Sequence, residues 1–320
     1  MAAISIDFGG TIIKLGIVES GQILASTTIP AISTDALRKR LPQVEEALQK
    51  LCLECDIHPS QCDGIAIGFP AIVDNKKNRI LNDFNKYPDA AEFDLEKWSM
   101  ETFGLPLALE NDARLATIGE WQYGVGQGHS NVVMMTIGTG LGTGVIIENR
   151  VLRGKNGQAG CLGGHISIDY KGPKCVCGNI GCAEALASSV SLQKQAENTA
   201  GFQTSKISKA HNLDYKTIFD LAKNNDTVAS EIVKYSIQIW SAMATNLIHA
   251  YDPEILILGG GVMKAADQIL PHIQQHILKH TVQSKGPVEI TIASLGNTAA
   301  LAGGQWLINE ANTRTLTNTL

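Results

Sequence analysis

Apolar and polar residues alternate along this chain in stretches whose length and period predict a mixed α/β fold. Short apolar runs bounded by glycines predict strands at 2–7, 12–18, 22–29, 64–69, 106–110, 131–140, 143–150, 254–261 and 288–295. Apolar residues that recur at three- and four-residue steps predict helices at 37–51, 112–121, 183–198, 215–224, 228–250 and 297–309. Ser33, Thr34 and Asp35 are candidate caps for the first helix, in which Pro42 requires a restart.

The second half of the chain repeats the first half in outline. A strand, a glycine-rich turn and a returning strand occur at 2–18 and again at 131–150. This repetition predicts two related α/β lobes with a ligand cleft between them. By symmetry we expect an N-terminal lobe over 1–118, onto which a closing helix at about 298–312 packs, and a larger lobe over 119–297.

Composition narrows the class of protein. The 320 residues include 26 basic and 31 acidic side chains, which argues against a nucleic-acid-binding protein, because such proteins usually carry a basic surface. No stretch of 18 uncharged apolar residues occurs, so we expect no membrane partner, and the N-terminus resembles no signal peptide. Seven cysteines without a secretory signal favour a reducing compartment, and we expect a cytoplasmic protein.

The first glycine-rich turn has the residues of a phosphate-binding hairpin. Gly9 and Gly10 let backbone N–H groups approach an anion, and Thr11 adds a hydroxyl donor. Lys14 supplies a nearby positive charge, and Asp7 a carboxylate suited to a hydrated Mg²⁺ ion. Taken alone, this turn is equally well explained as an ordinary hairpin.

Two further glycine clusters make a simple turn a poorer explanation. Gly138, Thr139 and Gly140 repeat the first hairpin, and Gly259, Gly260 and Gly261 follow an apolar strand. None of them matches a P-loop or a dinucleotide-binding fingerprint. The arrangement fits ATP held with two loops on its phosphates and the third against its adenosine.

A histidine and three cysteines have the spacing of a metal site. They are His165, Cys175, Cys177 and Cys182, and glycines within CVCGNIGC let the chain wrap around an ion. Three thiolates and one imidazole make a closed tetrahedral zinc site, which is structural because no position is left for a catalytic water.

A second set of residues has nominal ligand spacing but a different context. Cys52, Cys55, His58 and Cys62 include two cysteines on a predicted leucine-rich helix. We expect small apolar side chains in a core there rather than ligands.

The sequence ENDA at 110–113 carries the candidate general base. It lies where a strand meets a helix, so capping of the helix is the simple explanation. Phosphoryl transfer also needs a carboxylate that accepts the proton of the attacking hydroxyl. Asp112, beside Asn111 at the carboxyl end of a strand, is placed for that role.

These motifs together resemble the repressor/open-reading-frame/sugar-kinase (ROK) family. The matching segments, in family order, are DFGGT at 7–11, IGFPAIVD at 67–74, ENDA at 110–113, TIGTGLGTGVI at 136–146, the His165-to-Glu184 block, and DPEILILGGG at 252–261. The resemblance implies an actin-like (ribonuclease H-like) two-lobed ATPase fold with an interlobe cleft. It also implies a homodimer that phosphorylates a hexose or N-acetylhexosamine, usually at the 6-hydroxyl.

The resemblance assigns roles to individual residues. The family's catalytic aspartate falls on Asp112 and its sugar-contacting asparagine on Asn111. Its zinc ligands fall on the histidine and the three cysteines named above. The family histidine also faces the sugar, and a glutamate that contacts the sugar falls on Glu184.

Two positions depart from the family pattern. Ile12 replaces the lysine that usually follows DxGGT, and whether Lys14 substitutes for it stays open. The family's AGExGH becomes AGCLGGH, so Cys161 stands where the sugar-binding glutamate is expected. A thiol accepts hydrogen bonds poorly, which puts glucose itself in doubt as the substrate.

We therefore predict an ATP-dependent sugar kinase that uses Mg²⁺ and a structural Zn²⁺ ion. Residues 79–98 are expected to include part of the sugar pocket. The main alternative is a catalytically silent sugar-sensing regulator without a DNA-binding domain, because Asp7 lies too near the N-terminus to leave room for one. A chaperone-type or cytoskeletal ATPase on the same fold is a third possibility.

Overall fold

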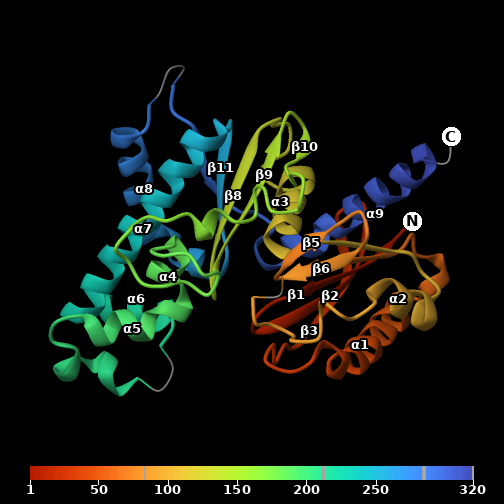
Figure 1. The fold of residues 1–320 in the computed structure, drawn as a ribbon, viewed down its shortest axis with the longest axis horizontal. Coiled ribbons are helices and arrows are strands. Elements are labelled where there is room, and N and C mark those ends of the chain that lie inside the picture. Colours follow the sequence, from red (N-terminus) through yellow and green to blue (C-terminus); the bar gives the residue numbers. More distant parts are fainter. Residues whose placement is uncertain (83, 211–212, 283–285, 319–320) are drawn as a thin grey trace. The chain divides into compact units, whose positions relative to one another are not determined.

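The computed structural model describes residues 1–320 except 83, 211–212, 283–285 and 319–320, and it omits the side chains of 315–318. The chain forms two compact units (Figure 1). Unit 1 comprises Met1–His129, Gly144–Cys161 and Ala293–Leu320, and unit 2 comprises Ser130–Thr143 and Leu162–Ile292. The expected boundary after residue 118 falls inside helix α3 (Asp112–Tyr123), which belongs to unit 1 as a whole.

The strands and helices have the following bounds. The strands are β1 Ala3–Phe8, β2 Ile12–Glu19, β3 Gln22–Pro30, β4 Ile65–Phe69, β5 Ile72–Asp74, β6 Arg79–Asn82, β7 Leu107–Asn111, β8 Val132–Ile137, β9 Leu141–Ile147, β10 Arg150–Val151, β11 Ile255–Gly259 and β12 Glu289–Ile292. The α-helices are α1 Leu41–Glu54, α2 Leu95–Phe103, α3 Asp112–Tyr123, α4 Ala183–Ala187, α5 Leu192–Asn198, α6 Tyr215–Lys223, α7 Thr227–Tyr251, α8 Ala266–His280 and α9 Ala299–Asn318. Short 3₁₀ turns connect several of them.

Unit 1 is built on a five-stranded sheet with the order β3-β2-β1-β4-β7. Strands β1, β4 and β7 are parallel, and β2 and β3 continue the sheet as antiparallel hairpin strands. Apolar residues of α1 and α2 join one core cluster with the sheet, and those of α3 and α9 join a second cluster (Figure 1). Helices therefore cover both faces of the sheet.

Helices α3 and α9 approach each other at glycines. A Cβ atom on Gly119 would lie 1.9 Å from the carbonyl oxygen of Ala299, and one on Gly303 would lie 2.4 Å from that of Leu115. Only glycine permits this separation of the two backbones. The helix that follows the candidate base thus packs directly on the helix at the end of unit 1.

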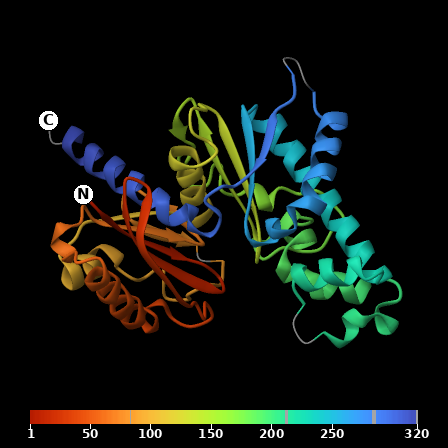
Figure 2. The ribbon, with the colours of Figure 1, turned by 180° about the vertical axis from the view of Figure 1, so that it is seen from behind.

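Unit 2 contains strands of the second sheet, which has the order β10-β9-β8-β11-β12. Strands β8, β11 and β12 are parallel to one another. Helix α7 packs on β8 and on α8, and both views show α7 and α8 as neighbouring helices that run in roughly the same direction (Figure 2).

Most predicted elements are present. The prediction was wrong about the start of the first helix, and it missed two helices. Helix α1 begins at Leu41, with Pro42 in its first turn, so the proline starts the helix instead of interrupting it. Ser33 does not cap this helix, because its hydroxyl donates to the carbonyl of Gly10 at 2.9 Å. Helices α2 and α8 were not predicted from the pattern. In α8 only a thin apolar stripe is buried, and Pro271 lies inside the helix.

No helix within the described residues is both long and apolar enough to cross a membrane.

Candidate functional site

The candidate base and Asp7 meet at the carboxyl ends of adjacent parallel strands in unit 1. Asp7 pairs with Gly68 in the β1–β4 register, and Gly68 pairs with Glu110 in the β4–β7 register. A Cβ atom on Gly68 would lie 3.5 Å from both Asp7 Oδ1 and the Cα atom of Asp112. Gly68 is therefore the spacer that lets the two acidic residues lie on either side of it.

Asn111 and Asp112 hold each other at the start of helix α3. Asn111 Oδ1 accepts a hydrogen bond from the backbone N–H of Arg114 at 3.0 Å, so the predicted helix cap is confirmed. The Asn111 amide donates to Asp112 Oδ1 at 3.0 Å and to the carbonyl of Ala71 at 3.2 Å. The N–H of Ala113 donates to the same Oδ1 at 2.8 Å. Among the described residues, Oδ2 is left out of these bonds and is available to accept a proton.

The electrostatic surroundings make Asp112 more basic than an ordinary aspartate. Burial raises the pKa of Asp112 because it disfavours the charged form. The positive charge of Lys86 lowers this pKa, and the negative charge of Asp7 raises it. The balance is a raised pKa, which suits a group that takes a proton and later releases it.

The first glycine-rich hairpin is closed by its backbone and held by distant side chains. The N–H of Gly9 donates to the carbonyl of Ile12 at 3.0 Å. The carbonyl of Gly9 accepts a hydrogen bond from the Tyr87 hydroxyl at 3.2 Å, and that of Gly10 accepts one from Ser33. Thr11 is exposed beside them. The backbone shape that the sequence predicted here thus depends on side chains well outside the motif.

Lys14 is oriented by Asp7. Its ammonium lies 2.7 Å from Asp7 Oδ2, and both side chains are mostly buried. Ile12, at the position of the family lysine, is 39% exposed. Lys14, two residues after Ile12 on the same strand, is therefore the cation paired with the aspartate of this hairpin.

Tyr87 lies in the 79–98 segment that was expected to include part of the sugar pocket, but it was not itself singled out from the sequence. Tyr87 is fully buried, and its ring contacts those of Phe8 and Phe69 with centroids 5.7 and 5.3 Å away. Phe84, Asn85 and Tyr87 have φ angles of 49°, 62° and 52°, in the left-handed region that such residues rarely adopt. Tertiary contacts impose this strain, so no local sequence signal marks it. Within the predicted 79–98 segment, Asp83 lies outside the described residues.

The second hairpin, in unit 2, is closed and supported by backbone groups. The N–H of Gly138 donates to the carbonyl of Gly140 at 3.0 Å. The carbonyls of Gly138 and Thr139 accept hydrogen bonds from Ser189 and Val190 at 3.1 and 3.3 Å. A Cβ on Gly138 would meet no atom within 4 Å, so open space lies beside this residue.

Glu184 packs against the same hairpin. Its Oε2 accepts a hydrogen bond from the N–H of Leu141 at 3.0 Å. A Cβ atom on Gly140 would lie 2.4 Å from this oxygen, so a larger residue at 140 would displace the Glu184 carboxylate. The carboxylate of Glu184 therefore orients the hairpin within unit 2.

The third glycine cluster combines packing and open space. Gly259 ends β11, and Gly260 has a φ of 89° with its Cα so close to β8 that a Cβ would lie 2.3 Å from the carbonyl of Ile137. A Cβ on Gly261 would meet no atom within 4 Å. The φ angle and the close packing on β8 thus explain why residue 260 is a glycine. Gly261 has open space beside it.

The predicted metal ligands gather in unit 2. One ligand atom from each of His165, Cys175, Cys177 and Cys182 lies within 4.8 Å of all the others. The sulfurs of Cys177 and Cys182 are 3.7 Å apart, and Cys175 Sγ is 3.5 Å from His165 Nδ1. A zinc ion with bonds of about 2.3 Å to sulfur and 2.0–2.1 Å to nitrogen has tetrahedral edges of about these lengths. The donor set and its spacing therefore fit zinc.

The metal cluster is continuous with the element that carries Glu184. Cys182 is the residue that precedes helix α4, and Gly181 before it has no room for a Cβ, which would lie 1.6 Å from the carbonyl of Asp169. Glu184 Oε1 is 3.9 Å from His165 Nδ1. An ion held by this cluster would thus fix the start of α4 and the position of Glu184.

Three of the other cysteines, Cys52, Cys55 and Cys62, pack in the apolar core of unit 1. Cys52 and Cys62 are buried members of the core of unit 1, as predicted, and within the described ranges only the Cys₃His set forms a metal-binding group. Cys161 is also buried, and its thiol lies 3.6 and 3.5 Å from the carbonyl oxygens of Gly157 and Gln158. The Cys161 thiol therefore contacts backbone carbonyl groups.

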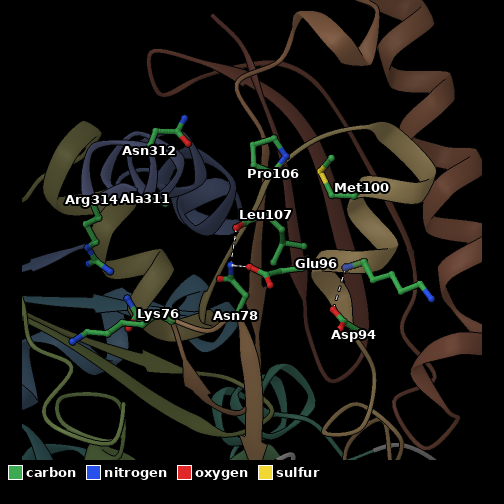
Figure 3. A pocket seen from close by; sticks show the side chains of 12 residues that line it. Lys76, Asn78, Asp94, Glu96, Met100, Pro106, Leu107, Ala311, Asn312 and Arg314 are labelled. Atoms are coloured by element: carbon green, nitrogen blue, oxygen red, sulfur yellow. Dashed lines mark hydrogen bonds between the residues drawn. The ribbon is translucent and has the colours of Figure 1, made fainter. Parts of the chain in front are cut away.

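A polar groove of about 860 Å³ in unit 1 contains none of the predicted catalytic, nucleotide-binding or metal-binding residues, but Asp94, Glu96 and Lys97 of the predicted 79–98 segment line it (Figure 3). Its wall includes Asn78, whose amide donates to Glu96 and to the carbonyl of Leu107, and Arg314 from α9. Acidic and basic side chains both line it.

The chain is similar in sequence to glucokinases and to a repressor. The chain is 32% identical over 317 residues to a glucokinase of Halalkalibacterium halodurans, covering 96% of this chain and 94% of that one. It is 29% identical over 249 residues to a xylose repressor of Bacillus spizizenii, covering 77% of this chain and 61% of the repressor.

A solved structure agrees with the first of these likenesses. A ROK family glucokinase from Streptomyces griseus, in complex with glucose and AMPPNP, superposes with a TM-score of 0.82 at 29% identity, covering 97% of this chain and all of that one. The predicted actin-like sugar-kinase fold class is thereby confirmed. The model of the ROK family matches residues 3–311, and the chain belongs to that family.

Proposed function

We propose that this protein is an ATP-dependent sugar kinase that phosphorylates a hexose or N-acetylhexosamine at its 6-hydroxyl. The observation that carries the proposal is the placement of Asp112, whose pKa is raised and whose Oδ2 lies outside the capping bonds. It stands beside Asp7 at the strand ends of a fold shared with a glucokinase.

In the proposed reaction Asp112 accepts the proton of the sugar hydroxyl as its oxygen attacks the γ-phosphorus of ATP. The new oxygen–phosphorus bond forms as the bond to the β-phosphate oxygen breaks, and ADP leaves with that electron pair. Asn111 holds Asp112 at Oδ1 and contacts the sugar, so the proton goes to Oδ2. His165 and Glu184 are proposed to contact the sugar as well.

The glycine-rich segments are proposed to bind ATP. Gly9, Gly10 and Thr11 would contact phosphates with Lys14 as the nearby cation, and so would Gly138, Thr139 and Gly140. Gly259, Gly260 and Gly261 would lie against the adenosine. The open space beside Gly138 and Gly261 supports these roles, because a ligand could approach the backbone closely there.

Two metal ions complete the proposal. Asp7 Oδ1 is suited to hold Mg²⁺ through water, since Lys14 occupies Oδ2, and Mg²⁺ would neutralise phosphate charge. Zn²⁺ would be structural, because His165 and the three cysteines supply four protein ligands and leave no open position.

Measurement of ADP release over a panel of hexoses, N-acetylhexosamines and short glycosides tests the function. We expect sugar-dependent ADP release that is abolished in Asp112→Asn, which should still bind the sugar. If sugars bind without any turnover, the chain is instead a sugar-sensing regulator. The likeness to a xylose repressor is the observation that favours this second function.

We further propose that the enzyme is a cytoplasmic homodimer, as expected from its family. Light scattering coupled to size-exclusion chromatography tests the dimer directly, and a monomer at micromolar concentration would contradict it.

A further inference from the structure

Four charged side chains form a buried series of ion pairs in unit 1. Glu110 and Arg114, both fully buried, are paired across the junction of β7 and α3. The other oxygen of Glu110 accepts a hydrogen bond from Arg153 Nε at 2.6 Å. The two terminal nitrogens of Arg153 donate to the two carboxylate oxygens of Glu310 in α9, at 3.1 and 2.8 Å. The Glu110–Arg114 pair brackets Asn111 and Asp112 in the sequence.

The second end of the Arg114 guanidinium binds a different part of the chain. Its Nη2 donates to the carbonyl oxygens of Gly157 and Ala159, at 3.0 and 2.8 Å. Arg114 Nε is buried and makes no hydrogen bond in the part of the chain that the structure describes. The orientation of Arg114 therefore leaves its Nε without a hydrogen bond, while its other two nitrogens connect Glu110 to two backbone carbonyls.

Stability alone does not explain this arrangement. A buried ion pair is often no more stabilising than apolar side chains of the same volume, and an unpaired buried donor has a cost. Burial would raise the pKa of Glu110, but the two guanidinium groups outweigh it and hold the pKa below its ordinary value, so the pair stays charged. A costly, charged and geometrically specific contact points to a positioning role.

The segment that Arg114 holds is the one that departs from the family. Gly157 packs so tightly on β5 that a Cβ would lie 2.1 Å from the carbonyl of Val73. The N–H of Ala159 donates to the carbonyl of Arg153 at 3.1 Å. The Cys161 thiol, where the family's sugar-binding glutamate is expected, lies against the carbonyl of Gly157. Arg114 therefore ties the 157–161 segment to the helix that begins with Asp112.

We propose that Arg114 is a positioning residue that holds the 157–161 segment beside Asp112 and thereby sets the affinity for the sugar. The proposal rests on the proposed sugar-kinase function. Asp112 itself is held by Asn111 and by the N–H of Ala113, which a change of the Arg114 side chain leaves in place. The effect is therefore expected on sugar binding more than on the chemical step.

Steady-state kinetics of Arg114→Lys test this inference. Lysine cannot reproduce a planar fork that binds one carboxylate and two carbonyls, so the KM for the sugar should rise about tenfold or more. The KM for ATP should stay within about twofold, and kcat should fall by less than the sugar KM rises. The exposed Arg150→Lys is the matched control and should behave as the wild type. An unchanged sugar KM, or equal rises in both KM values, would overturn the proposal.

Hydrogen–deuterium exchange provides a readout that does not depend on turnover. Peptides covering 154–161 should exchange faster in Arg114→Lys, while those covering α1 stay unchanged. If the single variant does not fold, the double variant Glu110→Gln, Arg114→Met removes the buried charges together and gives the same measurements. Unchanged exchange at 154–161 in a folded variant contradicts the contact.

The two proposals fail separately. If the wild type turns over no sugar, the sugar-kinase proposal fails, and exchange at 154–161 still decides whether Arg114 holds this segment. Calorimetry with glucose and N-acetylglucosamine then replaces KM as the measure of affinity. Binding that is equal in wild type and variant, or absent in both, rejects the role of Arg114 in sugar affinity.

Discussion

The two glycine-rich hairpins share a sequence pattern but differ in what holds them in place. In unit 1 the carbonyls of Gly9 and Gly10 accept hydrogen bonds from the hydroxyls of Tyr87 and Ser33. In unit 2 the carbonyls of Gly138 and Thr139 accept backbone hydrogen bonds from the turn after helix α4, which begins at a metal ligand. One hairpin depends on individual side chains, and the other depends on a segment that the Cys₃His cluster shapes.

The two hairpins therefore differ in their neighbours: charged groups lie near the first hairpin, and the Cys₃His cluster supports the second. Near the first hairpin, the charges of Lys86, Asp7 and Lys14 act on the pKa of Asp112. Near the second hairpin, Glu184 lies in the first turn of α4 and 3.9 Å from His165 of the Cys₃His group. Changes in unit 1 should therefore alter rate and pH dependence, and changes in unit 2 should alter stability as well.

The largest effect is expected at Asp112. Asp112→Asn keeps the capping geometry but removes the proton acceptor, so turnover should fall at least about a hundredfold, the usual contribution of a general base. Sugar binding measured by calorimetry should be retained. Turnover close to that of the wild type would remove Asp112 from this role.

A mutation in the Cys₃His cluster should lower turnover less than Asp112→Asn does, but it should also lower stability. Cys182→Ser removes one of four ligands, and zinc measured by atomic emission should fall from about one ion per chain to well below one. Melting temperature and turnover should fall together, with turnover lower by about tenfold or more. Cys55→Ser, at the residue that follows α1, is the matched control. A chain that stays fully stable and active without metal would show that the second hairpin does not depend on the cluster.

A pH shift without a large change in rate is expected at Lys86. Its positive charge lowers the pKa of Asp112, so Lys86→Met should raise that pKa further. Since the base acts when ionised, the acid limb of kcat/KM should move to higher pH, by about half a unit to one unit. Lys86→Arg should restore the wild-type profile, and the exposed Lys50→Met should leave it unchanged. An acid limb that does not move in Lys86→Met would show that this charge does not reach Asp112.

The smallest effect is expected at Tyr87. Tyr87→Phe removes one buried hydroxyl and leaves the Gly9 carbonyl without that bond, at a cost of about 1 kcal/mol. The KM for ATP should rise about fivefold, while the acid limb stays in place. Tyr235→Phe, at a partly exposed position in unit 2, is the control. A KM for ATP that matches the wild type would mean that the hydroxyl does not support the hairpin.

The sequence predicted the local features of this site well. Apolar runs located the central strands, which are buried on both faces, and apolar periodicity located amphipathic helices, which bury one face. The strand-to-helix junction at Asn111 followed from its capping residue. The spacing of the cysteines sufficed for the metal cluster, since all four ligands lie within 18 residues of sequence. These features are encoded by neighbours along the chain.

The sequence did not predict contacts between distant segments. Arg153 and Glu310 are 157 residues apart, and no periodicity connects them. The left-handed loop that delivers Tyr87 contains aromatic residues that do not favour such a conformation, so only the core around Phe8 and Phe69 accounts for it. Arg114, four residues after Glu110, could have been noticed once the two were placed across a strand–helix junction, but its hold on 157–161 required the structure.

The glycine contact between α3 and α9 has a consequence for synthesis of the chain. The sheet of unit 1 is made from residues before 112, yet the helix that seals one of its faces emerges from the ribosome some 190 residues later. Until then the sheet that carries Asp7 has only α3 on that side and lacks the part of the cover that α9 supplies. The half of the molecule with the titrating groups is thus completed after unit 2 has been translated, and a nascent chain stalled before residue 299 should need a chaperone to stay in solution.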